Sequence, residues 1–116
     1  METKAYWVGF NLVKGVGPVR MRSLIDYFGS LEVAWQAPSE SFRSAGLPQK
    51  VVENLLEKRN SVDLAQVMEW LEKKEIQVLT WEDNTYPGKL KDIDHPPPVI
   101  YYRGTIFPED DWAVAI

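Results

Sequence analysis

The sequence predicts an α+β protein, in which a bundle of helices over residues 1–74 is followed by the first strands of an α/β domain over residues 75–116. Up to about residue 74, apolar residues recur at the spacing of amphipathic helices. From residue 76 onward the chain is instead rich in β-branched and aromatic residues, separated by turns that contain proline and glycine. The final run, AVAI, is typical of a strand buried on both faces of a parallel sheet.

Proline, glycine and serine mark the ends of the predicted helices. Pro18 suits a first helical position because it has no N–H to leave unpaired, and Gly29 and Gly46 suit positions just after a helix. Ser30 can cap the next helix, since its hydroxyl can accept a hydrogen bond from a free amide of the first turn. These signals and the apolar spacing predict helices at residues 4–12, 18–28, 31–37, 39–45, 48–59 and 61–74.

Strands are predicted at residues 76–81, at residues 99–104 and at the final run, residues 113–116. A parallel strand buried on both faces needs neighbours on both sides, and the sequence supplies none after Ile116. We therefore expect this chain to be a fragment whose strands have open edges. The segment after about Asp94 is then expected either to be disordered or to pair with a second copy, which would give a homo-oligomer.

The segment VKGVGPVR, residues 13–20, predicts a glycine hinge between two helices. Its two glycines can adopt backbone angles closed to other residues, and the helix that begins at Pro18 leaves its first N–H groups without intrahelical partners. Those groups carry partial positive charge and can bind a phosphate. The first 30 residues are also the only net-basic part of the chain, with the cations clustered around the hinge. The candidate DNA-binding residues are Lys14, Gly15, Val16, Gly17, Val19, Arg20 and Arg22.

The same glycines allow a second interpretation, in which they only let two helices pack closely. Two nucleotide-binding interpretations are excluded. Arg20 stands where a dinucleotide-binding fingerprint needs its third glycine, and the sequence has no Gly-Lys-Ser/Thr for a Walker loop. Phosphate binding and helix packing therefore both stay open for the hinge.

Composition excludes several other classes of site. The chain has no cysteine, no signal peptide and no apolar run of membrane-spanning length, so we expect a cytoplasmic protein that does not contact a membrane. Its net charge of −4 argues against a protein that binds nucleic acid over its whole surface. The single histidine, His95, has no nucleophile nearby, and the acidic residues fall in turns, so we expect no catalytic site, metal or cofactor. The tryptophans expected in the core are Trp7, Trp35, Trp70 and Trp81.

Two stretches of the chain resemble known proteins. Residues 13–28, VKGVGPVRMRSLIDYF, resemble a helix-hairpin-helix motif, with Gly-apolar-Gly followed by a helix of matching apolar spacing. Residues 76–116 resemble the junction region of the DNA-processing protein A family (DprA, also called Smf). The residues that match in order are Tyr86, Pro87, Leu90, Pro97, Pro98, Tyr101, Gly104 and the closing AVAI. The hinge glycines and YFGS, residues 27–30, also match the helical domain of that family, so the resemblance covers nearly the whole chain.

The resemblance implies a SAM-like helical domain with the helix-hairpin-helix motif over residues 1–74, followed by the start of a Rossmann-like domain over residues 75–116. It also implies a cytoplasmic bacterial protein that binds single-stranded DNA, protects incoming strands in natural transformation and helps to load the RecA recombinase. In that family the principal DNA site and the dimer surfaces lie in the Rossmann-like domain. We therefore expect an N-terminal accessory domain of such a protein or, alternatively, a packing and protein-interaction module that does not itself bind DNA.

Overall fold

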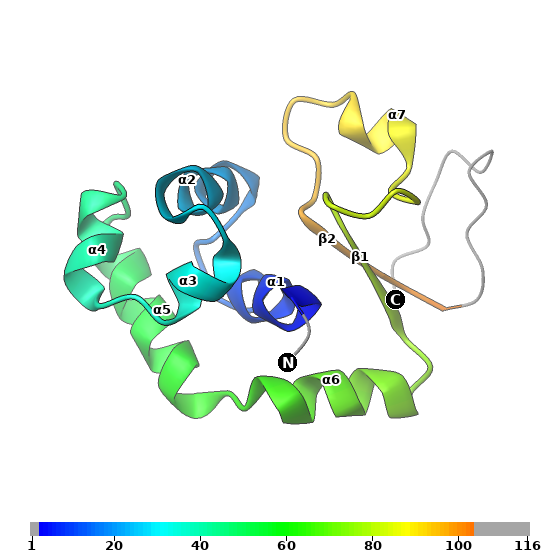
Figure 1. Ribbon diagram of the computed structural model, residues 1–116, viewed down its shortest axis with the longest axis horizontal. Helices are drawn as coiled ribbons and strands as arrows, with labels where there is room; N and C mark the ends of the chain where they lie inside the picture. The colour runs from blue at the N-terminus through cyan, green and yellow to red at the C-terminus, as the bar shows by residue number, and fades with distance from the viewer. Residues whose placement is uncertain (1–2, 104–116) are drawn as a thin grey trace.

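The structure is a computed structural model that describes residues 3–103, most of which are helical (Figure 1). In chain order the elements are α1 (Thr3–Asn11), α2 (Pro18–Phe28), α3 (Leu31–Trp35), α4 (Ser39–Ser44), α5 (Gln49–Ser61), α6 (Leu64–Lys73), β1 (Gln77–Thr80), α7 (Gly88–Lys91) and β2 (Val99–Tyr102). Helices combined with one small sheet confirm the predicted α+β class. No helix within residues 3–103 has the length and apolar character that crossing a lipid bilayer requires.

Helix α1 lies at the centre of the structure (Figure 1). Its residues 5–10 are all buried, including Trp7 and Phe10. Because residues 5–10 are apolar on every side of the helix, this part of α1 has no face to leave in water, and α1 accordingly contacts α3, α5, α6 and both strands. The centre of α1 is so tightly packed that a Cβ built on Gly9 would lie 2.9 Å from the Leu64 side chain. The helical part and the sheet are therefore built around one shared helix.

The caps of the short helices confirm the sequence prediction. Pro18 occupies the first position of α2, and Gly29 ends that helix with φ 85°. The Ser30 hydroxyl accepts a hydrogen bond from the Val33 amide at 3.3 Å, which starts α3. After α4, the chain turns at Gly46 with φ 97°, a conformation that glycine adopts without steric cost. Local backbone chemistry thus sets these helix ends.

The junction between α5 and α6 differs from the prediction, which began a helix near Ser61. Ser61 is instead the last residue of α5, and α6 is capped by Asp63. The Asp63 carboxylate accepts hydrogen bonds from the amides of Ala65 and Gln66 at 3.0 and 3.3 Å, so it satisfies two free donors of the first turn. Trp70 on α6 was also expected in the core, but it is 54% exposed because leucines form the buried face of that helix.

Strands β1 and β2 form an antiparallel pair, with Gln77 opposite Tyr102 and Thr80 opposite Val99. Val78 and Val99 belong to the same apolar core as the helices, so one face of the pair packs on the bundle. A second, smaller apolar cluster lies among the strands, Tyr86 and Leu90. The helical bundle and the sheet are therefore in direct contact.

The prediction of disorder after about Asp94 is wrong for residues 95–103. The Tyr86 hydroxyl donates a hydrogen bond to the Pro97 carbonyl at 2.6 Å, and β2 follows directly. The reason is that β1 of the same chain offers a strand with which β2 can pair. The final strand predicted at residues 113–116, and the parallel sheet it would enter, lie outside the described residues. The SAM-like and Rossmann-like assignments and the division at residues 74 and 75 stay predictions.

Candidate nucleic-acid interface

The glycine hinge (residues 14–19) lies between α1 and α2, and its two glycines differ in conformation. Gly15 has φ 99°, in the left-handed region that favours glycine. Gly17 has φ −101° and ψ −165°, which any residue can adopt. The expectation that both glycines use angles closed to other residues is therefore wrong for Gly17. The reason is that Pro18 disfavours a helical conformation in the residue before it, so Gly17 stays extended and Gly15 provides the turn.

One side of the hinge is packed against α5. A Cβ built on Gly15 would lie 2.9 Å from Cγ2 of Val51, a distance that leaves no room for a side chain. The Val16 side chain is buried, and the Asn54 side-chain amide donates a hydrogen bond to the Lys14 carbonyl at 2.9 Å. These contacts support the packing interpretation for Gly15, and they remove the Val16 side chain from any ligand.

The opposite side of the hinge is open to solvent. Nothing lies within 4 Å of a Cβ built on Gly17, and the Val19 side chain is 61% exposed. In the part of the chain that the structure describes, no acceptor pairs with the backbone N–H groups of Gly17, Val19 or Arg20. The amino end of α2 therefore presents unpaired donors and partial positive charge at an accessible surface.

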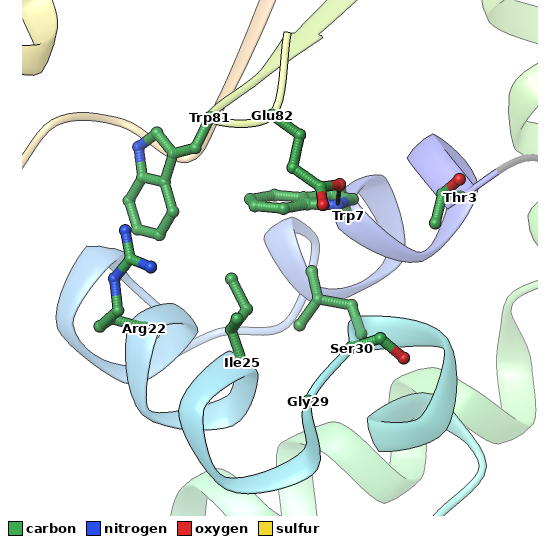
Figure 2. Close-up of a pocket in the computed structure, with 9 residues that line it drawn as sticks. Thr3, Trp7, Arg22, Ile25, Gly29, Ser30, Trp81 and Glu82 are labelled. Atoms are coloured by element: carbon green, nitrogen blue, oxygen red, sulfur yellow. Dashed lines mark hydrogen bonds between the residues drawn. The ribbon is translucent and has the colours of Figure 1, made fainter.

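The three cations predicted for the site occupy different positions. Arg20 folds back on the hinge, where its Nη1 donates a hydrogen bond to the Gly15 carbonyl at 2.8 Å. Arg22 turns toward the segment after β1, with its guanidinium carbon 4.7 Å from the centre of the Trp81 ring (Figure 2). Lys14 is exposed on the loop. The structure thus places Lys14 and Arg20 at the hinge, while Arg22 joins α2 to the strand region.

The sequence prediction missed Trp81 and His95 as neighbours of the hinge. Both line a recess of about 320 Å³, together with Pro18, Val19 and Arg22. Trp81 follows β1 and His95 follows α7, so both come from segments far from the hinge along the chain. No local pattern could have found them, because only the packing of the strand region on the bundle brings them beside α2.

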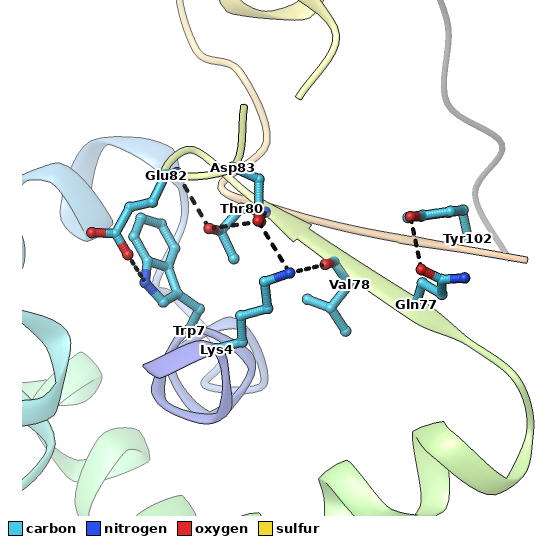
Figure 3. Close-up of polar contacts among 8 residues, drawn as sticks. All are labelled: Lys4, Trp7, Gln77, Val78, Thr80, Glu82, Asp83 and Tyr102. Atoms are coloured by element: carbon cyan, nitrogen blue, oxygen red, sulfur yellow. Dashed lines mark hydrogen bonds and ion pairs between the residues drawn. The ribbon is translucent and has the colours of Figure 1, made fainter. Parts of the chain in front are cut away.

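Polar contacts from α1 help to hold the strand region in this place (Figure 3). The Lys4 ammonium donates to the Val78 carbonyl at 3.0 Å and pairs with the Asp83 carboxylate at 3.1 Å. The Trp7 indole N–H donates to the Glu82 carboxylate at 3.0 Å. Because residues 82 and 83 directly follow Trp81, these contacts fix the Trp81 segment relative to the bundle.

Two tyrosines of the strand region, Tyr86 and Tyr101, have a raised pKa. Burial raises the pKa of Tyr101 above its usual 10.0, and the hydrogen bond from the Asn11 side chain to its hydroxyl opposes that effect. Burial also raises the pKa of Tyr86, with a smaller opposing effect from Trp81. Both tyrosines are therefore neutral at physiological pH. Among residues 3–103, no three His, Asp or Glu side chains lie close enough together to hold a metal ion.

Comparison with known proteins gives a relative for most of the chain. It is 39% identical over 104 residues, or 89% of the chain, to Protein Smf of Synechocystis sp. (strain ATCC 27184 / PCC 6803 / Kazusa). The aligned part is 26% of that relative, so the chain spans about a quarter of the relative's length. No protein-family model matches the chain, and no solved structure matches it.

Proposed function

Because this chain belongs to the DNA-processing protein A family (DprA, or Smf), we propose that it is an accessory domain of a protein that binds single-stranded DNA. In this proposal the amino end of α2 holds a phosphate of the DNA backbone, and Lys14 and Arg20 add positive charge beside it. The whole protein, as the family resemblance implies, protects incoming strands in natural transformation and loads the RecA recombinase onto them. It acts in the bacterial cytoplasm.

The open amino end of α2 is the single observation that carries the proposal. A helix amino end carries a partial positive charge of roughly +0.5. Here the free N–H groups of Val19 and Arg20 can donate hydrogen bonds to an anion at that end. The lack of a side chain at Gly17 is not needed for internal packing, since a Cβ there would meet nothing within 4 Å. That absence does let a phosphate oxygen approach the backbone. Arg20 uses one guanidinium donor on Gly15, which leaves others for the phosphate.

The proposed contact is weak and independent of sequence. Backbone N–H groups and cations at phosphates carry no base information. Non-specific binding of this kind has dissociation constants of roughly 1–100 µM at physiological salt. With a net charge of −4 on the whole chain, attraction is confined to the hinge, so binding should weaken steeply as salt is added.

A titration of the chain with a fluorescent single-stranded oligonucleotide, followed by anisotropy at several salt concentrations, tests this proposal. Lys14→Glu should weaken binding and lower the slope of log K against log salt by about 0.7, the value for one lost phosphate contact on a single strand. Arg20→Glu should weaken binding further, since it also removes the hydrogen bond to Gly15. Lys74→Glu is the matched control, because it makes the same change in charge at the far end of α6.

The absence of binding at low salt would contradict the proposal, as would equal binding by Lys14→Glu, Arg20→Glu and the Lys74→Glu control. Circular dichroism of each variant shows whether it is folded as the parent chain is, so a loss of binding can be assigned to the charge.

The second candidate function is a packing and protein-interaction module without DNA binding. It is favoured by the packed side of the hinge, where Gly15 contacts Val51 and Asn54 bonds to the loop. It is also favoured by the contacts through which Lys4 and Trp7 hold the strand region on α1. If the titration finds no binding at low salt, this is the function that remains.

A further inference from the structure

A recess lies beside the hinge. One side of it is lined by Pro18, Val19 and Arg22 of α2, and the other side by Trp81, His95 and Pro96. We call it the hinge recess. Its volume of about 320 Å³ lies near the lower end of the range of small-ligand sites, about 300–1,000 Å³. Because Val19 borders both the recess and the amino end of α2, a ligand in the recess can be continuous with a phosphate on that helix end.

The Arg22 and Trp81 pair forms the wall of the hinge recess that is best suited to an aromatic ligand. The guanidinium of Arg22 lies over the Trp81 ring, which Trp7 contacts edge-on at 5.8 Å between ring centres (Figure 2). The ring contacts therefore fix Trp81, and Trp81 in turn limits the positions open to Arg22. Within residues 3–103, no carboxylate lies within ion-pairing distance of Arg22. A planar cation that is held in place without an anionic partner is suited to stack on a nucleobase or to bind its phosphate.

We propose that the hinge recess receives one unstacked base of a single-stranded nucleic acid. This inference rests on the proposed function, because the phosphate next to that base is the one placed on the amino end of α2. The base contacts Trp81, Arg22 and Pro96, and its phosphate lies on the Val19 side. Asp94 lines the recess on the opposite side, so a phosphate there would be repelled.

The chemistry of the hinge recess selects a single strand over a duplex. In a duplex the bases are paired and stacked on their neighbours, so a base must first be unpaired and unstacked, at a cost in free energy, before it can enter the recess. In a single strand the bases are readily splayed out and can stack on aromatic rings or guanidinium planes. Stacking of this type tolerates any base, since every base has a π-face.

Two oligonucleotides with the same number of phosphates test this inference. One is oligo-dT, and the other is a chain of abasic tetrahydrofuran spacers of the same length. The parent chain should bind oligo-dT about 5- to 150-fold more tightly, the range expected for stacking of one base. Trp81→Leu should bring this ratio close to one while it leaves the affinity for the abasic strand unchanged. Trp70→Leu, at the exposed tryptophan of α6, is the matched control and should keep the ratio of the parent chain.

Arg22→Gln is a second variant. Arg22 is exposed and makes no ion pair among the described residues, so the change removes only its contact with the Trp81 ring and should keep the fold. It should also lower the ratio, so the test does not depend on the folding of Trp81→Leu. Equal binding of both oligonucleotides by the parent chain would overturn the inference, and a Lys14→Glu effect in the same assay would then leave the proposed function standing. A ratio preserved in Arg22→Gln and in folded Trp81→Leu would also overturn it. Binding of neither strand at low salt would refute both proposals.

Discussion

Replacing the two hinge glycines one at a time should separate the packed side of the hinge from its open side. Gly15→Ala introduces a methyl group at φ 99°, whereas Gly17→Ala introduces the same group at φ −101°. The two variants have the same amino-acid composition, and their substitutions lie two residues apart in the sequence. Any difference in stability between them therefore reports the local geometry of each glycine.

The expected cost of Gly15→Ala has two parts. A side chain in the left-handed region costs about 1–2 kcal/mol. The new Cβ would also lie 2.9 Å from Cγ2 of Val51, whose β-branched side chain in α5 cannot easily rotate away, and overpacking of this kind costs about 1–3 kcal/mol. The smaller entropy of the unfolded chain returns about 0.4–1 kcal/mol. We expect a net loss of about 2–4 kcal/mol in the free energy of unfolding.

Gly17→Ala should instead change the free energy of unfolding by less than about 1 kcal/mol in either direction. Its backbone conformation is open to alanine and nothing lies within 4 Å of the new methyl group. The smaller entropy of the unfolded chain raises stability by about 0.4–1 kcal/mol, and the poorer N-cap that alanine gives α2 offsets part or all of that gain. In the titration with single-stranded DNA, however, the methyl group would stand where the phosphate approaches. Gly17→Ala should therefore weaken DNA binding although the fold is intact.

Urea unfolding followed by tryptophan fluorescence measures both variants. With a slope of about 1–3 kcal/mol per molar urea, the midpoint of Gly15→Ala should fall by roughly 1–4 M and that of Gly17→Ala should change by much less. A double-mutant cycle with Val51→Ala isolates the steric part, because the smaller side chain relieves the clash but not the backbone strain. Equal losses in the two glycine variants, or no coupling between Gly15→Ala and Val51→Ala, would refute the reasoning.

Three further predictions concern stability. Lys4→Met should lower the free energy of unfolding, measured by urea titration, by about 1 kcal/mol. The loss is modest because Lys4 and Asp83 are partly exposed. An unchanged midpoint would show that this ion pair does not hold the strand region. Asp63→Ala should cost about 1 kcal/mol through the loss of the α6 cap, whereas Asp63→Asn should recover most of it in thermal unfolding. Because burial raises the folded-state pKa of Tyr86 and Tyr101, the folded chain holds their protons more tightly than the unfolded chain, so stability should fall as pH rises above about 10.0. Tyr86→Phe and Tyr101→Phe should each flatten that alkaline decline, and a profile that keeps the slope of the parent chain in both variants would contradict the assignment.

The order and type of the helices could be predicted from the sequence because their determinants are local. The ends of α2 and α3 depend on Pro18, Gly29 and Ser30, whose effects act through backbone angles and hydrogen bonds within one turn. The start of α6 was misplaced because Ser61 and Asp63 are both residues that favour the start of a helix, and only the path of the chain selects between them. Trp70 was misplaced because a helical apolar stripe does not show how much of it the neighbours cover.

The sequence by itself determined that a glycine hinge with nearby cations leads into a helix, since this follows from residue types and spacing. Only the tertiary structure decided that Gly15 is closed by Val51 while Gly17 faces open space. Only the tertiary structure also placed Arg22 against Trp81, which lies 59 positions further along the sequence. The physical reason is that backbone preferences act over a few residues, whereas the accessibility of a helix end and the partner of a side chain depend on which distant segments pack beside them.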